Sequence, residues 1–411
     1  MKSVRKQYNN KSFAYVRGLV RGVGDTDSII VYHIAKYFKE AFLVISSSKK
    51  LAFSPVKNVK VINIPVKKTR VPFLSGLIFS ILAFLRLFTL KNKPSIILWI
   101  WSLAFPGAFL YKIFVPFSKV VIDIRTHPII RECNLYDKLM EALFKLTLSV
   151  PLFDGYTIIT KSMLAYVRTR YNILKNIDRI CIWNSGYDKQ LFKIMREKLV
   201  KYKRGEIRNW FNLKEQDKAL LYYGSLDYAR YDMLVTIIDS LKILTKKCYE
   251  NIKILIVGDG DAKEKLLEYI NRNYLEKQVV FLPPVPYPLV PVLLEVADVV
   301  VAPYPLNSNW YTQHPLKVIE AIAMLKPIIT TPLRELRELL PGELLVASSR
   351  GKIDPYELAC KIEKLLLIIE KKNDEYIRII QRLREIREKF SWDVIAQQLY
   401  DCLRRKVIRD L

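Results

Sequence analysis

The segment HPLKVIEAIAMLKPIITT, residues 314–331, decides the local architecture, because a helical pattern runs directly into a short apolar strand. Pro315 suits the first helical position, where the backbone N–H would be unpaired in any case. The pattern predicts a helix over 315–325 and a buried strand over 326–331. A helix joined this closely to a buried strand is typical of a parallel α/β fold.

Lys317 and Glu320 stand at positions of this helix that suit a bound anion. Lys317 falls in the first turn, beside the positive end of the helix dipole, where a cation is unfavourable unless an anion lies nearby. Glu320 follows three residues later on the same face and can accept hydrogen bonds from sugar hydroxyls. The pair indicates binding of a nucleotide diphosphate, and the alternative is an exposed Lys–Glu pair on an ordinary helix.

The same alternation of apolar runs and helical stretches extends over the whole chain. In the first half we expect strands near 12–17, 41–46, 59–64, 95–101, 119–124 and 155–160, and helices near 26–39, 72–90, 103–114, 135–148 and 162–171. In the second half we expect strands near 218–224, 252–257, 278–282, 298–302, 326–331 and 343–347, and helices near 232–247, 261–273, 287–296, 315–325, 333–340 and 354–389. A polar, basic segment around 193–217 separates the halves. Two doubly wound units facing each other would place a ligand in a cleft at the carboxyl ends of the strands.

Size and composition indicate a folded protein of two domains. The chain has 411 residues, 51% of them hydrophobic and only 13 of them glycine, which argues against a largely disordered chain. The cysteines are scattered and form no C-x-x-C pair, which favours a reducing compartment and argues against a structural zinc site; they are Cys133, Cys181, Cys248, Cys360 and Cys402. Residues 1–12 are polar and basic, so we expect no signal peptide.

The net charge of +27 is unevenly distributed along the chain. Residues 1–200 contain 33 Lys and Arg against 11 Asp and Glu, a net charge of +22. No acidic residue occurs between Glu40 and Asp123. The first half is therefore expected to meet an anionic partner such as a lipid headgroup, a phosphorylated acceptor or a nucleic acid. A nucleic acid is the least favoured of these, because long apolar runs interrupt the basic residues.

Residues 71–90, VPFLSGLIFSILAFLRLFTL, form an apolar stretch with Lys67, Lys68 and Arg70 before it and Lys91 and Lys93 after it. The stretch is long enough to span a membrane, but a span would break a strand–helix–strand unit, so we discount it. Two interpretations remain open. One is a mostly buried crossover helix, and the other is a helix lying in the membrane interface with basic flanks on anionic headgroups.

Two glycine turns in the second half follow predicted strands. Leu220–Leu226, LLYYGSL, ends in Gly224 and Ser225 and is followed by Arg230, so its backbone and the Arg can hold a phosphate; a plain turn with a solvated Arg is the alternative. Ile254–Asp261, ILIVGDGD, lacks the third glycine of a dinucleotide-binding pattern. Asp261 is expected to cap a helix there rather than to bind metal.

Two loops in the first half also follow predicted strands. Asp123–Pro128, DIRTHP, places His127 where it can hydrogen-bond a sugar hydroxyl, with an ordinary loop histidine as the alternative. Arg21–Asp25, RGVGD, opens the first helix, so that Gly22, Gly24 and Asp25 can face the cleft. Capping of that helix by Asp25 is the alternative.

Taken in order, these motifs resemble the retaining GT-B glycosyltransferases of family four (group 1). The order is Y-x-G-S-L with Arg230, I-L-I-V-G-D-G-D, V-V-F-L, A-D-V-V-V-A-P and P-L-K-V-I-E-A-I-A-M-L-K-P-I-I-T-T. The segment from Trp183, W-N-S-G-Y-D, and the segment from Phe390, F-S-W, are similar to two further motifs of the family. The resemblance is dense from Trp183 to about Leu403 and weak before it.

The resemblance implies a GT-B architecture of two Rossmann-like domains. The acceptor-binding domain would span 1–195, the nucleotide-sugar-binding domain 205–385, and a helix over 386–411 would return to the first domain. Glu320 would bind the ribose, Arg230 and Lys317 the diphosphate, and His127 the transferred sugar. Further donor contacts would come from Gly224, Ser225, Gly258, Thr312, Gln313, His314 and Leu316, and the acceptor or sugar loop from Gly22, Gly24 and Asp25.

Three positions depart from the family pattern. Ser225 stands where the family has Arg, Thr312 where it has the first Glu of E-x7-E, and Pro283 where it has Gly. The resemblance as a whole implies a glycosyltransferase of the hexosyl type (EC 2.4), which retains configuration and uses no metal and no cofactor besides its nucleotide-sugar co-substrate. The expected acceptor is a lipid-linked glycan or polyisoprenyl phosphate, and the expected location is cytoplasmic, with attachment to the inner face of a membrane left open. The alternative is a non-catalytic GT-B protein that binds a nucleotide sugar or a partner.

Overall fold

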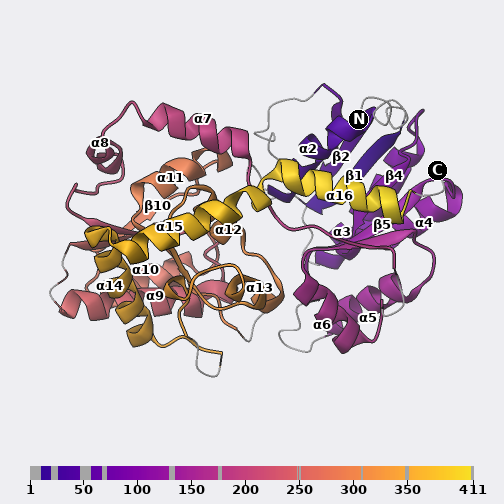
Figure 1. Ribbon diagram of the computed structural model, residues 1–411. Helices are drawn as coiled ribbons and strands as arrows, with labels where there is room; N and C mark the ends of the chain where they lie inside the picture. Colours follow the sequence, from indigo (N-terminus) through magenta and orange to yellow (C-terminus); the bar gives the residue numbers. More distant parts are fainter. Residues whose placement is uncertain are drawn as a thin grey trace. The chain divides into compact units, whose positions relative to one another are not determined.

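The computed structural model describes residues 11–19, 26–46, 57–66, 72–128, 135–174, 178–247, 249, 251–306, 309–347 and 351–408. The chain divides into two compact units (Figure 1). The N-terminal unit consists of Met1–Ser185 and Trp392–Leu411, and the C-terminal unit consists of Gly186–Ser391. Each unit is described by itself below.

The N-terminal unit contains a seven-stranded parallel sheet in the order β3-β2-β1-β4-β5-β6-β7. Its strands are β1 Ser12–Leu19, β2 Glu40–Ser46, β3 Val59–Asn63, β4 Ile96–Ile100, β5 Lys119–Ile124, β6 Gly155–Ile158 and β7 Ile180–Ile182. Every residue of β4 is buried, as expected of a central parallel strand that is covered on both faces. The order reverses between β1 and β4, and ligands of such sheets bind at the carboxyl ends of the strands near this point.

Helices connect the strands of this sheet. They are η1 Thr26–Ile29, α2 Ile30–Ile34, η2 Ala35–Tyr37, α3 Pro72–Phe88, η3 Trp101–Leu103, α4 Gly107–Phe114, α5 Leu135–Ser149, α6 Lys161–Tyr171 and α16 Trp392–Lys406. The last of them, α16, comes from the far end of the chain and packs against α2 and β7. In the part of the chain described here, no helix has the length and hydropathy of a membrane-spanning segment.

The C-terminal unit contains a five-stranded parallel sheet in the order β10-β9-β8-β11-β12. Its strands are β8 Lys218–Tyr223, β9 Ile252–Val257, β10 Val279–Leu282, β11 Val299–Ala302 and β12 Ile328–Thr330. Its helices are α7 Lys189–Leu199, α8 Arg204–Asn209, α9 Tyr228–Lys246, α10 Lys263–Arg272, η4 Tyr287–Leu289, α11 Val290–Val296, η5 Asn309–Thr312, α12 Leu316–Ala323, α13 Arg334–Arg337, η6 Gly342–Leu344, α14 Pro355–Lys371, α15 Asp374–Arg387 and η7 Glu388–Phe390. The prediction of two Rossmann-like parallel α/β units is confirmed.

Several predicted elements differ from the structure. The polar segment 193–217 is not a linker, because it contains the end of α7 and all of α8. The W-N-S-G-Y-D motif begins α7, since the Asp188 carboxylate accepts a hydrogen bond of 2.9 Å from the Leu191 N–H. The first unit therefore ends at Ser185 rather than at 195, and α7 belongs to the second unit.

Two differences concern the end of the C-terminal unit. The predicted helix 354–389 is broken at Lys372, which has a φ of 46°, and Asn373 caps the next helix by accepting from the Tyr376 N–H at 3.1 Å. The predicted strand 343–347 is a 3-10 turn over Gly342–Leu344, followed by a single bridge between Leu345 and Thr330. Pro341 precedes this turn and has no N–H to donate to a strand partner.

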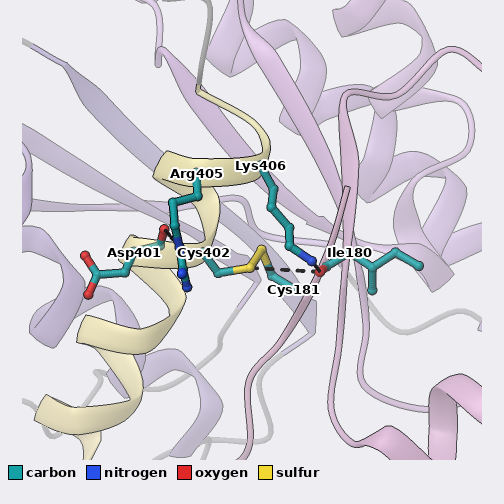
Figure 2. The surroundings of a disulfide bond; sticks show 6 residues. All are labelled: Ile180, Cys181, Asp401, Cys402, Arg405 and Lys406. Atoms are coloured by element: carbon teal, nitrogen blue, oxygen red, sulfur yellow. Dashed lines mark hydrogen bonds between the residues drawn. A yellow bond between two sulfur atoms is a disulfide. The ribbon is translucent and has the colours of Figure 1, made fainter. Parts of the chain in front are cut away.

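A disulfide bond joins Cys181 of β7 to Cys402 of α16 across 221 residues, with their Cα atoms 5.8 Å apart (Figure 2). Lys406 donates to the Ile180 carbonyl at 3.0 Å beside it. The sequence analysis inferred a reducing compartment from the scattered cysteines. Because Cys181 and Cys402 are paired, the cysteines no longer support that inference. Cys360 is free, while Cys133 and Cys248 lie outside the described residues.

We expect Cys402→Ser to destabilise the oxidised protein by about 2–4 kcal/mol, because the unfolded chain regains the entropy of an open loop. Thermal unfolding under non-reducing conditions measures the loss, and Cys360→Ser is the matched control. Reduction of the wild type should lower its unfolding temperature to nearly that of Cys402→Ser. A wild type that is insensitive to reductant would contradict the bond.

Candidate functional site

Three glycines allow backbone segments to meet at the carboxyl ends of β8 and β9. A Cβ atom added at Gly258 would lie 1.9 Å from the Gly224 carbonyl oxygen, and one added at Gly260 would lie 2.5 Å from the Leu226 backbone. Gly224 has a φ of +135°, and a Cβ there would lie 2.6 Å from the Lys317 Nζ. Backbone atoms exclude a side chain at Gly258 and Gly260, and the positive φ disfavours one at Gly224, where the end of the Lys317 side chain occupies the space that a Cβ would take.

Lys317 lies in the first turn of α12, as predicted, although Pro315 caps the helix instead of occupying its first position. The side chain is half-buried, and its Nζ lies 5.2 Å from the ring centre of Tyr222. Burial, and to a smaller extent the nearby Arg230, lower the pKa of Lys317 to about 8, against the opposing effects of Glu320 and Asp227. Lys317 is thus a partly buried cation at a helix N-terminus, which attracts anions.

Glu320 lies one turn further along α12 and is buried. Its Oε2 accepts a hydrogen bond of 2.7 Å from the Tyr223 hydroxyl. Burial raises the pKa of Glu320 to about 7, while Tyr223 and Lys317 act in the opposite direction. The alternative of an exposed Lys–Glu pair is therefore wrong, because the carboxylate lies inside the unit.

Arg230 lies in the first turn of α9 and is held by two groups that the sequence analysis missed. Its guanidinium forms an ion pair with the Asp227 carboxylate and stacks at 4.6 Å over the ring of Trp310. The Ser225 hydroxyl donates to the same carboxylate at 2.9 Å. Ser225 therefore contacts Arg230 through Asp227, in the loop that leaves β8.

The segment before α12 places its residues in different surroundings. Thr312 and His314 are buried, whereas Gln313 and Leu316 are half-buried. The His314 ring packs edge-on against Phe390 with ring centres 5.6 Å apart. The His314 Nε2 lies 4.0 Å from a carboxylate oxygen of Glu335, and the donor contact of His314 remains a prediction.

The two aspartates of the G-D-G-D turn are exposed. The prediction that Asp261 caps the following helix is wrong, because α10 begins at Lys263 and Ala262 is its N-cap. The Asp261 carboxylate instead accepts a hydrogen bond of 3.2 Å from the Tyr228 N–H at the start of α9. Within the described ranges, no group of three or more His, Cys, Asp or Glu could hold a metal ion. Metal independence remains a prediction.

His127 of the N-terminal unit is buried, and its ring packs on Tyr166 at 4.5 Å. Its Nδ1 lies 2.9 Å from the Pro128 carbonyl oxygen, which can only accept, so Nδ1 carries the proton. Burial lowers the pKa of His127, against the opposing effect of its contact with the Pro128 carbonyl. Gly22, Gly24 and Asp25 lie outside the described residues.

A buried polar network beside His127 was not predicted as such. The Asp123 carboxylate accepts from Tyr15 at 2.8 Å, from Thr157 at 2.6 Å and from the Trp183 indole at 3.1 Å. Arg125 donates to the Trp183 carbonyl at 2.8 Å and covers its ring at 4.0 Å. Burial raises the pKa of Asp123, and Arg125 acts against that rise. The network fixes the loop that carries His127.

We expect Glu320→Gln to stabilise the protein more at pH 8 than at pH 4.5. The folded pKa of about 7 exceeds the ordinary value of 4.5, so the stability contributed by the neutral carboxyl is present below pH 4.5 and is lost as the pH rises through 7. Gln stays neutral and avoids that loss, which amounts to about 3 kcal/mol. Thermal unfolding at both pH values measures the effect, with the exposed Glu338→Gln as control. An equal effect at both pH values would show that Glu320 titrates normally.

Part of the chain is similar in sequence to known glycosyltransferases. Residues 217–367 match the family model of Glycosyl transferases group 1. An uncharacterized glycosyltransferase of Methanocaldococcus jannaschii is 26% identical over 196 residues, which cover 46% of this chain and 46% of that protein. The matched region therefore spans about half the length of this curated relative.

Solved structures resemble the whole chain. A glycosyltransferase from Rickettsia africae has a TM-score of 0.69 at 14% identity and covers 98% of this chain and 100% of its own. Sucrose-phosphate synthase from Thermosynechococcus elongatus has a TM-score of 0.71 at 18% identity, covering 96% and 99%. Anabaena HepE in complex with UDP has a TM-score of 0.64 at 16% identity, covering 96% and 100%. The chain thus has the fold of GT-B glycosyltransferases, and residues 217–367 of its C-terminal unit are similar to the glycosyl transferases group 1 family.

Proposed function

We propose that this protein is a retaining glycosyltransferase that takes a sugar from a nucleotide-sugar donor without a metal. The observation that carries the proposal is the half-buried Lys317 ammonium, held against the Gly224 backbone in the first turn of α12. A buried cation at a helix N-terminus is costly until an anion reaches it, and a diphosphate supplies that anion. The HepE structures, which contain UDP in one case and UDP-glucose in another, support a donor of this class.

In this proposal the donor's diphosphate lies against the N–H groups of α12 and the Gly224 turn. Lys317 and Arg230 stabilise the negative charge that develops on the diphosphate as the bond to the sugar breaks. Glu320 accepts the ribose hydroxyls through the carboxylate oxygen that Tyr223 does not occupy. Since hydrogen bonds to a carboxylate favour its ionised form, donor binding would lower the pKa of Glu320.

The N-terminal unit would bind the acceptor. His127 presents Nε2 as an acceptor for a sugar hydroxyl, because its Nδ1 proton is directed to Pro128. The proposed reaction is hexosyl transfer at the cytoplasmic face of a membrane. The second candidate function, a non-catalytic nucleotide-sugar binder, is motivated by Ser225 and Thr312, which stand where the family carries Arg and Glu.

We further propose that the acceptor carries a hydrocarbon chain, as in a polyisoprenyl phosphate or a lipid-linked glycan. A cavity of about 150 Å³ opens beside the carboxyl end of β4, between α3, η3 and α5. Its lining is mostly apolar and includes Phe73, Leu77, Trp101, Phe105, Tyr136 and Met140. Such a lining suits the end of an aliphatic chain better than a sugar.

We expect Lys317→Met to weaken nucleoside diphosphate binding by about tenfold and to slow sugar transfer by about a hundredfold. The exposed Lys277→Met is the control.

In the wild type, the affinity for a nucleoside diphosphate should fall as the pH rises past the Lys317 pKa of about 8, where the ammonium is lost. This pH dependence should vanish in Lys317→Met. Thermal shifts with UDP-, GDP- and ADP-sugars, followed by turnover of the one that binds, measure both effects. Binding without turnover would favour the non-catalytic alternative, and no binding would reject the donor site.

We expect Ser102→Trp to block the cavity, because Ser102 is an exposed residue of its lining. The KM for a long-chain polyisoprenyl phosphate should rise by about tenfold, while that for a short-chain analogue changes little. Ser102→Ala is the control. An equal change for both chain lengths would argue against a hydrocarbon site in this cavity.

A further inference from the structure

The helix α3 exposes an apolar stripe along its length in addition to the apolar face that it buries. The stripe consists of large side chains three or four residues apart, each between 36% and 46% exposed; they are Leu74, Ile78, Ile81, Leu85 and Phe88. The opposite face is buried through Phe79, Ala83 and Leu87. A crossover helix needs only that second face to pack on its sheet, so packing within the unit does not account for the stripe.

The neighbouring helix α4 continues this apolar surface. The ring centres of Phe88 and Phe114 lie 6.2 Å apart. Ile113, Phe114 and Phe117 are each at least 60% exposed. We call these three residues together with the stripe of α3 the α3–α4 ridge. Seven large apolar side chains on two packed helices, with Phe117 in the turn after α4, form a patch of the kind that marks a binding surface.

The charged residues from α3 to Lys93 are all positive. Lys93 holds its ammonium 5.4 Å from the centre of the Phe88 ring, and Arg86 and Lys91 are exposed at the same end of α3. Residues 72–122, all of which the structure describes, contain no acidic residue. Lys112 and Lys119 do not contribute free charge, because both pair with Asp154.

These observations distinguish between possible occupants. A second copy of the chain would bring an equally basic ridge against this one, since residues 1–200 carry a net charge of +22. An anionic lipid surface complements both the charge and the aliphatic and aromatic side chains. The stripe runs along the helix, so α3 would lie in the plane of such a surface, which agrees with the absence of a membrane-spanning helix among the described residues.

We propose that the α3–α4 ridge docks the protein on an anionic membrane, with the apolar side chains in the headgroup boundary and Arg86, Lys91 and Lys93 on lipid phosphates. The two interpretations of residues 71–90 then both hold, for opposite faces of one helix. The proposal extends the lipid-linked acceptor of the proposed function by naming the surface that meets the membrane. It does not depend on the donor site.

Cosedimentation with vesicles tests this proposal. The full-length protein should bind vesicles of phosphatidylcholine with phosphatidylglycerol and should not bind vesicles of phosphatidylcholine alone. The triple variant Leu85→Ser, Phe88→Ser, Phe117→Ser should lose binding by at least about tenfold. The double variant Lys91→Glu, Lys93→Glu should bind anionic vesicles at least about tenfold more weakly. High salt should weaken vesicle binding of the wild type in the same way, because it screens the charges.

The matched control is Leu367→Ser with Ile377→Ser, which removes exposed apolar side chains from the C-terminal unit. All variants should keep the thermal shift with nucleoside diphosphate, which shows that they are folded. Lys317→Met should lose that shift and keep vesicle binding, so failure of the donor site and failure of the docking surface are distinguishable. Absence of vesicle binding, an equal loss in the control, or a dimer that the triple variant dissociates would each overturn the proposal.

Discussion

The close contact between the Lys317 ammonium and the Gly224 backbone is the constraint on which the C-terminal unit depends. It needs a glycine at the end of β8, a second glycine at the end of β9, and a helix that starts at Leu316. It also places a cation among tyrosine rings, where its pKa falls to about 8. A partly buried cation at a helix N-terminus is suited to a phosphate group.

The N-terminal unit is organised by a comparable buried charge with a different outcome. Asp123 accepts three hydrogen bonds, and Arg125 lies close enough to influence its pKa. Asp123 accepts its bonds inside the unit, whereas Lys317 lies half-buried in the first turn of a helix. We take the first arrangement to hold a loop in place, because hydrogen-bonded buried networks rigidify a structure, and the second to receive an anion.

Much of this could be predicted from the sequence. The strands were found because their apolar runs are nearly continuous, and Lys317 and Glu320 were found because they interrupt an amphipathic helix. Asp227 and Trp310 were missed, since nothing local shows which acid or ring will meet Arg230. The Cys181–Cys402 bond was missed because 221 residues separate its ends. Which face of α3 is exposed depends on how its neighbours pack, and periodicity does not contain that information.

The position of α16 has a consequence for how the protein is made. The N-terminal unit begins with the first residues of the chain but is completed only by Trp392–Leu411. During synthesis, the ribosome must therefore deliver the whole of Gly186–Ser391 before β7 can receive its covering helix. The unit that is translated second is contiguous and can fold first, while the unit translated first keeps an uncovered sheet edge until α16 has been made.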